Sequence, residues 1–83
     1  MNRRVEMPTR ILYAVDTATG ERYRLMTLHP DGSLTADAPD MVEAIPIFQA
    51  RGLSNEFIFE RTRRRSNAYI RHVEEVIPDP DPQ

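Results

Sequence analysis

The sequence predicts a small two-layer α+β domain, in which one proline-kinked helix packs across an antiparallel sheet. Three observations support this fold class. The first half contains short apolar runs separated by turn signals, the middle changes to a helical period, and the last third returns to short apolar runs. A helix with one apolar stripe and a sheet with one apolar face bury both surfaces when they pack together.

Length and composition indicate one domain without covalent cross-links. The chain has 83 residues and no cysteine, so neither a disulfide framework nor a cysteine-based zinc site is available. We expect a flexible lead-in over residues 1–8, a single α+β domain over 9–77, and an acidic proline-rich tail over 78–83. No apolar run has the length of a signal peptide or of a membrane span. The expected location is therefore the cytoplasm, without membrane association.

The N-terminal part of the domain is predicted to be a three-stranded meander. Residues 10–15 and 23–28 are rich in β-branched, aromatic and other apolar side chains. Between them, Asp16 can hydrogen-bond its own backbone and Gly20 can adopt a positive φ, so the two runs form a hairpin. A second turn over residues 29–32 leads into a short third strand at 33–35.

A helix is predicted over residues 39–51. Asp37 or Asp40 could cap its N-terminus, and Gly52 could end it. One helical face carries apolar residues at i, i+3, i+4 and i+7, namely Met41, Ala44, Ile45 and Phe48.

Pro46 lies inside this predicted helix. It has no N–H to donate, and its ring crowds the carbonyl of Val42, at a cost of roughly 3 kcal/mol in a regular helix. We therefore expect a kink, or a break into two short helices, at this point.

The C-terminal third is predicted to add a strand or a hairpin to the sheet. Residues 56–60 read as a strand through Phe57, Ile58 and Phe59. Residues 66–77 fit either a helix behind a Ser66 cap or a strand. The strand is favoured, because residues 57–59 then gain a hairpin partner and the arginine-rich segment between them becomes the hairpin loop.

That arginine-rich segment is the most distinctive feature of the chain. Residues 61–72 contain five arginines and no acid, although the whole chain has a formal net charge of -2. Guanidinium groups can bind carboxylates or phosphates in a bidentate way, and a nearby aromatic ring adds a stacking surface. The predicted partner-binding residues are Arg61, Arg63, Arg64, Arg65, Tyr69 and Arg71.

Three interpretations of this segment remain open. It could be a solvated loop without a partner, a site for the acidic surface of a protein partner, or a nucleic-acid site. Because the positive charge is segregated within an acidic chain, the protein partner is favoured over nucleic acid. Exposure of Phe57, Phe59 or Tyr69 would indicate an interface. Since a domain of this size buries only roughly 60% of its unfolded surface, a homo-oligomer also stays open.

No residue pattern predicts catalysis, a metal or a cofactor. His29 and His72 lie far apart without metal-ligand spacing, and the adjacent carboxylates of Glu74 and Glu75 point to different faces of a helix or strand. The sequence therefore predicts a small non-enzymatic binding or regulatory module that acts by protein–protein interaction. Inhibitors and adaptors of larger machinery encoded by phages and mobile elements are of this type.

Overall fold

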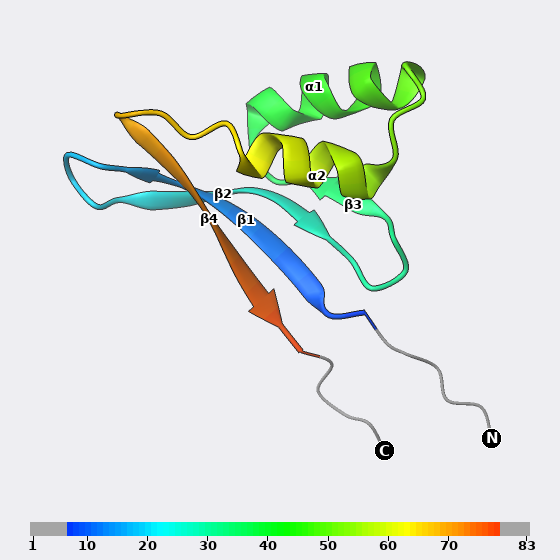
Figure 1. The fold of residues 1–83 in the computed structure, drawn as a ribbon, viewed down its shortest axis with the longest axis horizontal. Coiled ribbons are helices and arrows are strands. Elements are labelled where there is room, and N and C mark those ends of the chain that lie inside the picture. The colour runs from blue at the N-terminus through cyan, green and yellow to red at the C-terminus, as the bar shows by residue number, and fades with distance from the viewer. Residues whose placement is uncertain (1–6, 79–83) are drawn as a thin grey trace.

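The computed structural model describes residues 7–78, which form a small α+β domain. The predictions for residues 1–6 and 79–83 lie outside the described residues. In chain order the elements are β1 (Thr9–Asp16), β2 (Arg22–Leu28), β3 (Leu34–Ala36), α1 (Pro39–Ala50), α2 (Asn55–Arg63) and β4 (Ile70–Ile77). The strands make one antiparallel sheet in the order β3-β2-β1-β4, and both helices lie on the same side of it (Figure 1).

The predicted N-terminal meander is confirmed. In the first turn, Asp16 Oδ1 accepts the N–H of Ala18 at 2.8 Å, and Gly20 has a φ of 80°. β1 and β2 pair with Leu12 opposite Met26, and the register then shifts by one residue at a β-bulge. The second turn places Gly32 at a φ of 90° and leads into β3.

The helix predicted over residues 39–51 is confirmed as α1. Of the two alternatives at Pro46, the break into two short helices is wrong, while the kink stays a prediction. The helix is continuous from Pro39 to Ala50. Both Val42 and Pro46 are exposed, so the Val42 carbonyl that loses its donor lies on the side of the helix that water can reach. Hydration of that carbonyl offsets part of the cost of an interior proline.

The caps of α1 differ in part from the prediction. Its N-cap is Ala38, without a side-chain cap, because Asp37 instead accepts a 2.6 Å hydrogen bond from the Thr27 hydroxyl. Pro39, in the first turn, has no N–H that would need an acceptor. The predicted end at Gly52 is confirmed by its φ of 88° and by its N–H bond to the Gln49 carbonyl.

The strand predicted over residues 56–60 is wrong, since these residues belong to α2. Ser54 caps this helix by accepting the N–H of Phe57 at 3.1 Å. Phe59 and its neighbour Ile58 are both fully buried, whereas Phe57 is 51% exposed. A strand would place residues 57 and 59 on one face, whereas in a helix residue 57 points away from the stripe formed by 55, 58, 59 and 62.

The last segment is the strand β4, as favoured from the sequence, but the predicted C-terminal hairpin is wrong. β4 pairs with β1 along its whole length, from Thr9 opposite Ile77 to Asp16 opposite Ile70. The arginine-rich segment therefore joins a helix to an edge strand instead of closing a hairpin. The largest fully buried side chains lie between the sheet and the helices, and they are Phe59, Leu12, Met26 and Ile58.

We predict that Phe59→Ala lowers the free energy of unfolding by about 3–5 kcal/mol, because Phe59 has no exposed surface. Phe57→Ala, at an exposed position of the same helix, should change it by less than about 1 kcal/mol. Urea denaturation monitored by circular dichroism measures both values, and Phe59→Leu provides a milder core variant. Equal losses for Phe57→Ala and Phe59→Ala would contradict the helical arrangement.

Candidate functional site

The arginine-rich segment consists of the end of α2 and the loop that follows. Arg61 and Arg63 lie in the last helical turn, Arg64 is the C-cap, and Arg65 comes directly after it. Cations at this end of a helix are stabilised by the partial negative charge of its last carbonyl groups. Part of the arginine pattern therefore has a structural explanation.

Arg63 belongs to an ion-pair network that joins α2 to the sheet. Its Nη2 lies 2.7 Å from Glu60 Oε1, and its Nε lies 3.7 Å from Glu74 Oε1. Arg10, on β1, pairs with the same two carboxylates and lies 4.7 Å from the centre of the Phe59 ring. Since Arg63 holds α2 against β4, its guanidinium is already occupied within the domain.

The network shifts the protonation equilibria of its members. The hydrogen bond that Arg10 donates to Glu74 raises the pKa of Arg10 above its ordinary value; burial opposes this shift, and the hydrogen bond to Glu60 adds to it. Hydrogen bonds from Arg10 and then from Arg63 lower the pKa of the Glu60 carboxyl. Both shifts favour the charged forms that make the network.

Next to Arg63 lie three arginines that have no carboxylate partner within residues 7–78, namely Arg61, Arg64 and Arg65. Among the ion pairs between residues 7 and 78, none includes these three side chains. All three are exposed and line a surface hollow of about 670 Å³ together with Phe57 and Glu56. The hollow therefore combines three available guanidinium groups with an exposed aromatic ring.

A second hollow, of about 360 Å³, lies on the other side of Arg61 and Arg65, between α1, α2 and β4. Phe48 and His72 line it, and the Arg61 guanidinium lies 5.0 Å from the centre of the Phe48 ring. His72 Nδ1 lies 2.7 Å from the Thr62 carbonyl oxygen, so Nδ1 carries the proton of the neutral ring. Arg61 and Arg65 thus form a ridge between two hollows.

The other two predicted site residues lie apart from this ridge. Tyr69 is 79% exposed and precedes β4. Arg71 lies opposite Val15 in the β1–β4 register, and Val15 alternates with the core residue Ala14. Arg71 is therefore on the face of the sheet that the helices do not cover. The structure gathers Arg61, Arg64 and Arg65, but it does not bring Tyr69 and Arg71 into one surface with them.

The sequence prediction missed the position of Phe57 in this site. It treated residues 57–59 as a strand, in which Phe57 and Phe59 would share one face. The helical spacing of Ile58, Phe59 and Thr62 behind the Ser54 cap was the signal that separates Phe57 from the core.

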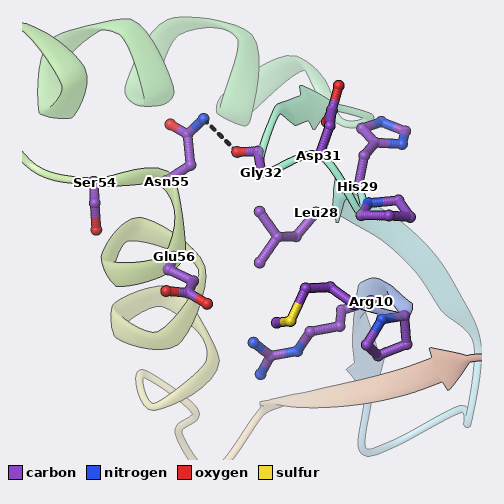
Figure 2. Close-up of a pocket in the computed structure, with 11 residues that line it drawn as sticks. Arg10, Leu28, His29, Asp31, Gly32, Ser54, Asn55 and Glu56 are labelled. Carbon is purple, nitrogen blue, oxygen red and sulfur yellow. Dashed lines mark hydrogen bonds between the residues drawn. The ribbon is translucent and has the colours of Figure 1, made fainter. Parts of the chain in front are cut away.

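A third hollow lies at the opposite end of α2. Figure 2 shows it between Arg10, the turn that carries His29, and the start of the helix, with Leu28 among its lining residues. Asn55 Nδ2 closes one side by donating a 2.9 Å hydrogen bond to the Gly32 carbonyl. Its volume is about 330 Å³, and none of the six predicted site residues lines it.

Within residues 7–78, no three histidine or carboxylate side chains are grouped so that they could hold a metal ion. In the same range, no helix is long and apolar enough to cross a membrane. Comparisons with protein-family models, with curated proteins and with solved structures found no match.

We predict that Glu60→Gln lowers the stability at pH 7 by about 1 kcal/mol, the scale of partly exposed ion pairs, and that this loss shrinks in acid. The folded-state pKa of Glu60 lies below its ordinary value of 4.5. Its contribution is therefore fully present above pH 4.5 and is lost as the pH falls through the folded-state pKa. Urea denaturation of both proteins between pH 7 and pH 2 measures the difference, with Glu56→Gln as the matched control. A difference that does not change with pH would exclude this role for Glu60.

We further predict that the arginines of the segment separate into two classes. Arg63→Ala should lower the free energy of unfolding by about 1 kcal/mol, because it removes the contacts to Glu60 and Glu74. Arg64→Ala and Arg65→Ala should each change it by less than about 0.5 kcal/mol. Thermal unfolding of the three variants tests this, and equal losses at all three positions would contradict it.

Proposed function

We propose that this chain is a small non-enzymatic binding module that docks on the acidic surface of a protein partner through Arg61, Arg64 and Arg65. The observation that carries the proposal is the hollow that these three side chains line together with the exposed Phe57, while none of them has an ion-pair partner in the described residues. Arginine binds carboxylates in a bidentate way, and a partly exposed aromatic ring serves as an apolar anchor at an interface. Binding of this kind would allow the module to inhibit or adapt a larger protein.

The carboxylates at the hollow favour a protein partner over a nucleic acid. Glu60 is neutralised by Arg10 and Arg63, whereas Glu56 adds an exposed negative charge to the rim. A phosphate backbone with one charge per nucleotide would be repelled by Glu56 and by the net charge of -2. A protein surface can instead place separate carboxylates on the arginines and apolar side chains on Phe57.

We predict that replacing Arg61, Arg64 and Arg65 together by Gln abolishes capture of the partner from a lysate of the source cells, because the three guanidinium contacts are lost. The matched control replaces Arg22, Arg24 and Arg51, which are also exposed and remove the same charge. The control set also includes one stacked arginine, since Arg22 lies 4.3 Å from the centre of the Tyr13 ring. Capture on the immobilised protein, followed by mass spectrometry, measures the outcome.

Nuclease treatment and the salt dependence of binding distinguish a protein partner from a nucleic acid. A protein partner is retained after nuclease, while a nucleic acid would bind directly in an anisotropy titration with oligonucleotides. In that case log K would fall with log salt at a slope of about -2 to -3 for three neutralised phosphates. Equal loss of capture in the control variant, or capture that nuclease removes, would overturn the proposal.

A further inference from the structure

The strand β4 lies at the edge of the sheet, and its backbone groups alternate between β1 and the open edge. The Tyr69 carbonyl accepts the N–H of Thr17 at 3.0 Å, so odd-numbered backbone groups face β1. The even-numbered groups face outward, as shown by the His72 N–H, which donates to Ser66 Oγ at 2.9 Å. Beyond β4, the described part of the chain contributes no further strand to the sheet.

The loop before β4 covers only the first half of this edge. The N–H and the carbonyl of Ile70 bond to Asn67, and His72 bonds to Ser66. By the same alternation, the backbone N–H and carbonyl groups of Glu74 and Val76 point outward, and no strand within residues 7–78 lies beside them. Residues 73–77 therefore form an open half-edge, a place where an extended segment can add a strand.

The side chains of this half-edge alternate between apolar and acidic on the face away from the helices. Val73 is 40% exposed and Ile77 is 41% exposed, and Glu75 lies between them. The Glu75 carboxylate accepts a 3.0 Å hydrogen bond from the Tyr13 hydroxyl, and none of the ion pairs within residues 7–78 includes it. The half-edge thus presents one available negative charge between two apolar side chains.

A second copy of β4 does not fit this half-edge well. Antiparallel pairing that uses the outward groups of Glu74 and Val76 on both copies is centred on Glu75. It places Val73 opposite Ile77 twice, which is favourable, but it also places Glu75 opposite Glu75. If the pairing is centred on Glu74 instead, Glu74 of one copy lies opposite Glu74 of the other. If the centre moves further toward the start of β4, the second copy collides with the loop that contains Ser66 and Asn67. Like charge therefore opposes self-pairing centred on Glu75 or on Glu74. Pairing centred on Val76 sets Glu74 opposite Pro78, which has no N–H to donate.

We propose that residues 73–77 of β4 bind an extended segment of a protein partner in which a basic residue is flanked, two positions away on each side, by apolar residues. The segment adds antiparallel to β4 and exchanges backbone hydrogen bonds with Glu74 and Val76. Its basic side chain lies opposite Glu75, where directly paired Cβ atoms are about 4.5–5.5 Å apart. Its apolar side chains lie opposite Val73 and Ile77. This surface is separate from the arginine hollow and does not depend on the function proposed for it.

A variant of this chain with one reversed charge can serve as the binding partner that tests the proposal. In Glu75→Arg, residues 73–77 acquire the apolar–basic–apolar pattern. The wild-type and E75R proteins should each be monomeric, because like charges meet in either homodimer, whereas their equimolar mixture should form a heterodimer. We expect the heterodimer to be at least tenfold tighter than either homodimer, as measured by analytical ultracentrifugation with one protein labelled.

The matched control is E56R mixed with wild-type protein, which makes the same charge change on α2 and should stay monomeric. A synthetic peptide with the core Val-Thr-Arg-Thr-Val tests the same edge on wild-type protein, and it should shift the NMR amide signals of Glu74 and Val76. The peptide with glutamate in place of arginine should not. Absence of both the heterodimer and these shifts, or an E56R mixture that dimerises equally well, would overturn the proposal. So would a wild-type homodimer through β4.

Discussion

The arrangement of the domain depends on the Arg10 guanidinium, which joins three elements at one point. From β1 it reaches Glu60 on α2 and Glu74 on β4, while its plane lies near the ring of Phe59. β4 has few apolar contacts of its own with the helix layer. Its helix-facing residues Ile70, His72 and Glu74 are only half-buried, so polar contacts supply much of its attachment to α2.

This network also decides which charges remain available at the surface. It neutralises Glu60 and occupies Arg63, so around the end of α2 the exposed arginines without an ion pair in residues 7–78 are Arg61, Arg64 and Arg65. Along β4, successive side chains point to opposite faces of the sheet, and this separates the carboxylates of Glu74 and Glu75. Glu74 points toward Arg10, whereas Glu75 points to the uncovered face of the sheet and bonds to Tyr13. Adjacent glutamates thus act at different surfaces, one holding the fold together and the other available to a partner.

The parts of the fold that were predicted correctly are those specified by nearby residues. The first hairpin follows from Asp16 and Gly20 in its turn, and α1 follows from its apolar spacing and from Gly52 at its end. The assignment failed at α2, because Phe57, Ile58 and Phe59 form a short apolar run that fits a strand as well as a helix. The other residues on the buried side of α2, Asn55 and Thr62, are polar. The sequence therefore has no extended apolar stripe that would identify this segment as a helix.

The sequence by itself determined the α+β class, the meander, the first helix and the presence of an unusual arginine-rich segment, because each depends on local spacing and turn chemistry. Only the tertiary structure decided that β4 pairs with β1 instead of with residues 57–59, since strand pairing across more than fifty residues leaves no local pattern. That pairing separates Arg71 from the other arginines and gives Arg63 its partner Glu74. In the sequence, nothing separates Arg63 from Arg61, Arg64 and Arg65. The fold separates them, because it places Glu60 and Glu74 within ion-pair distance of Arg63.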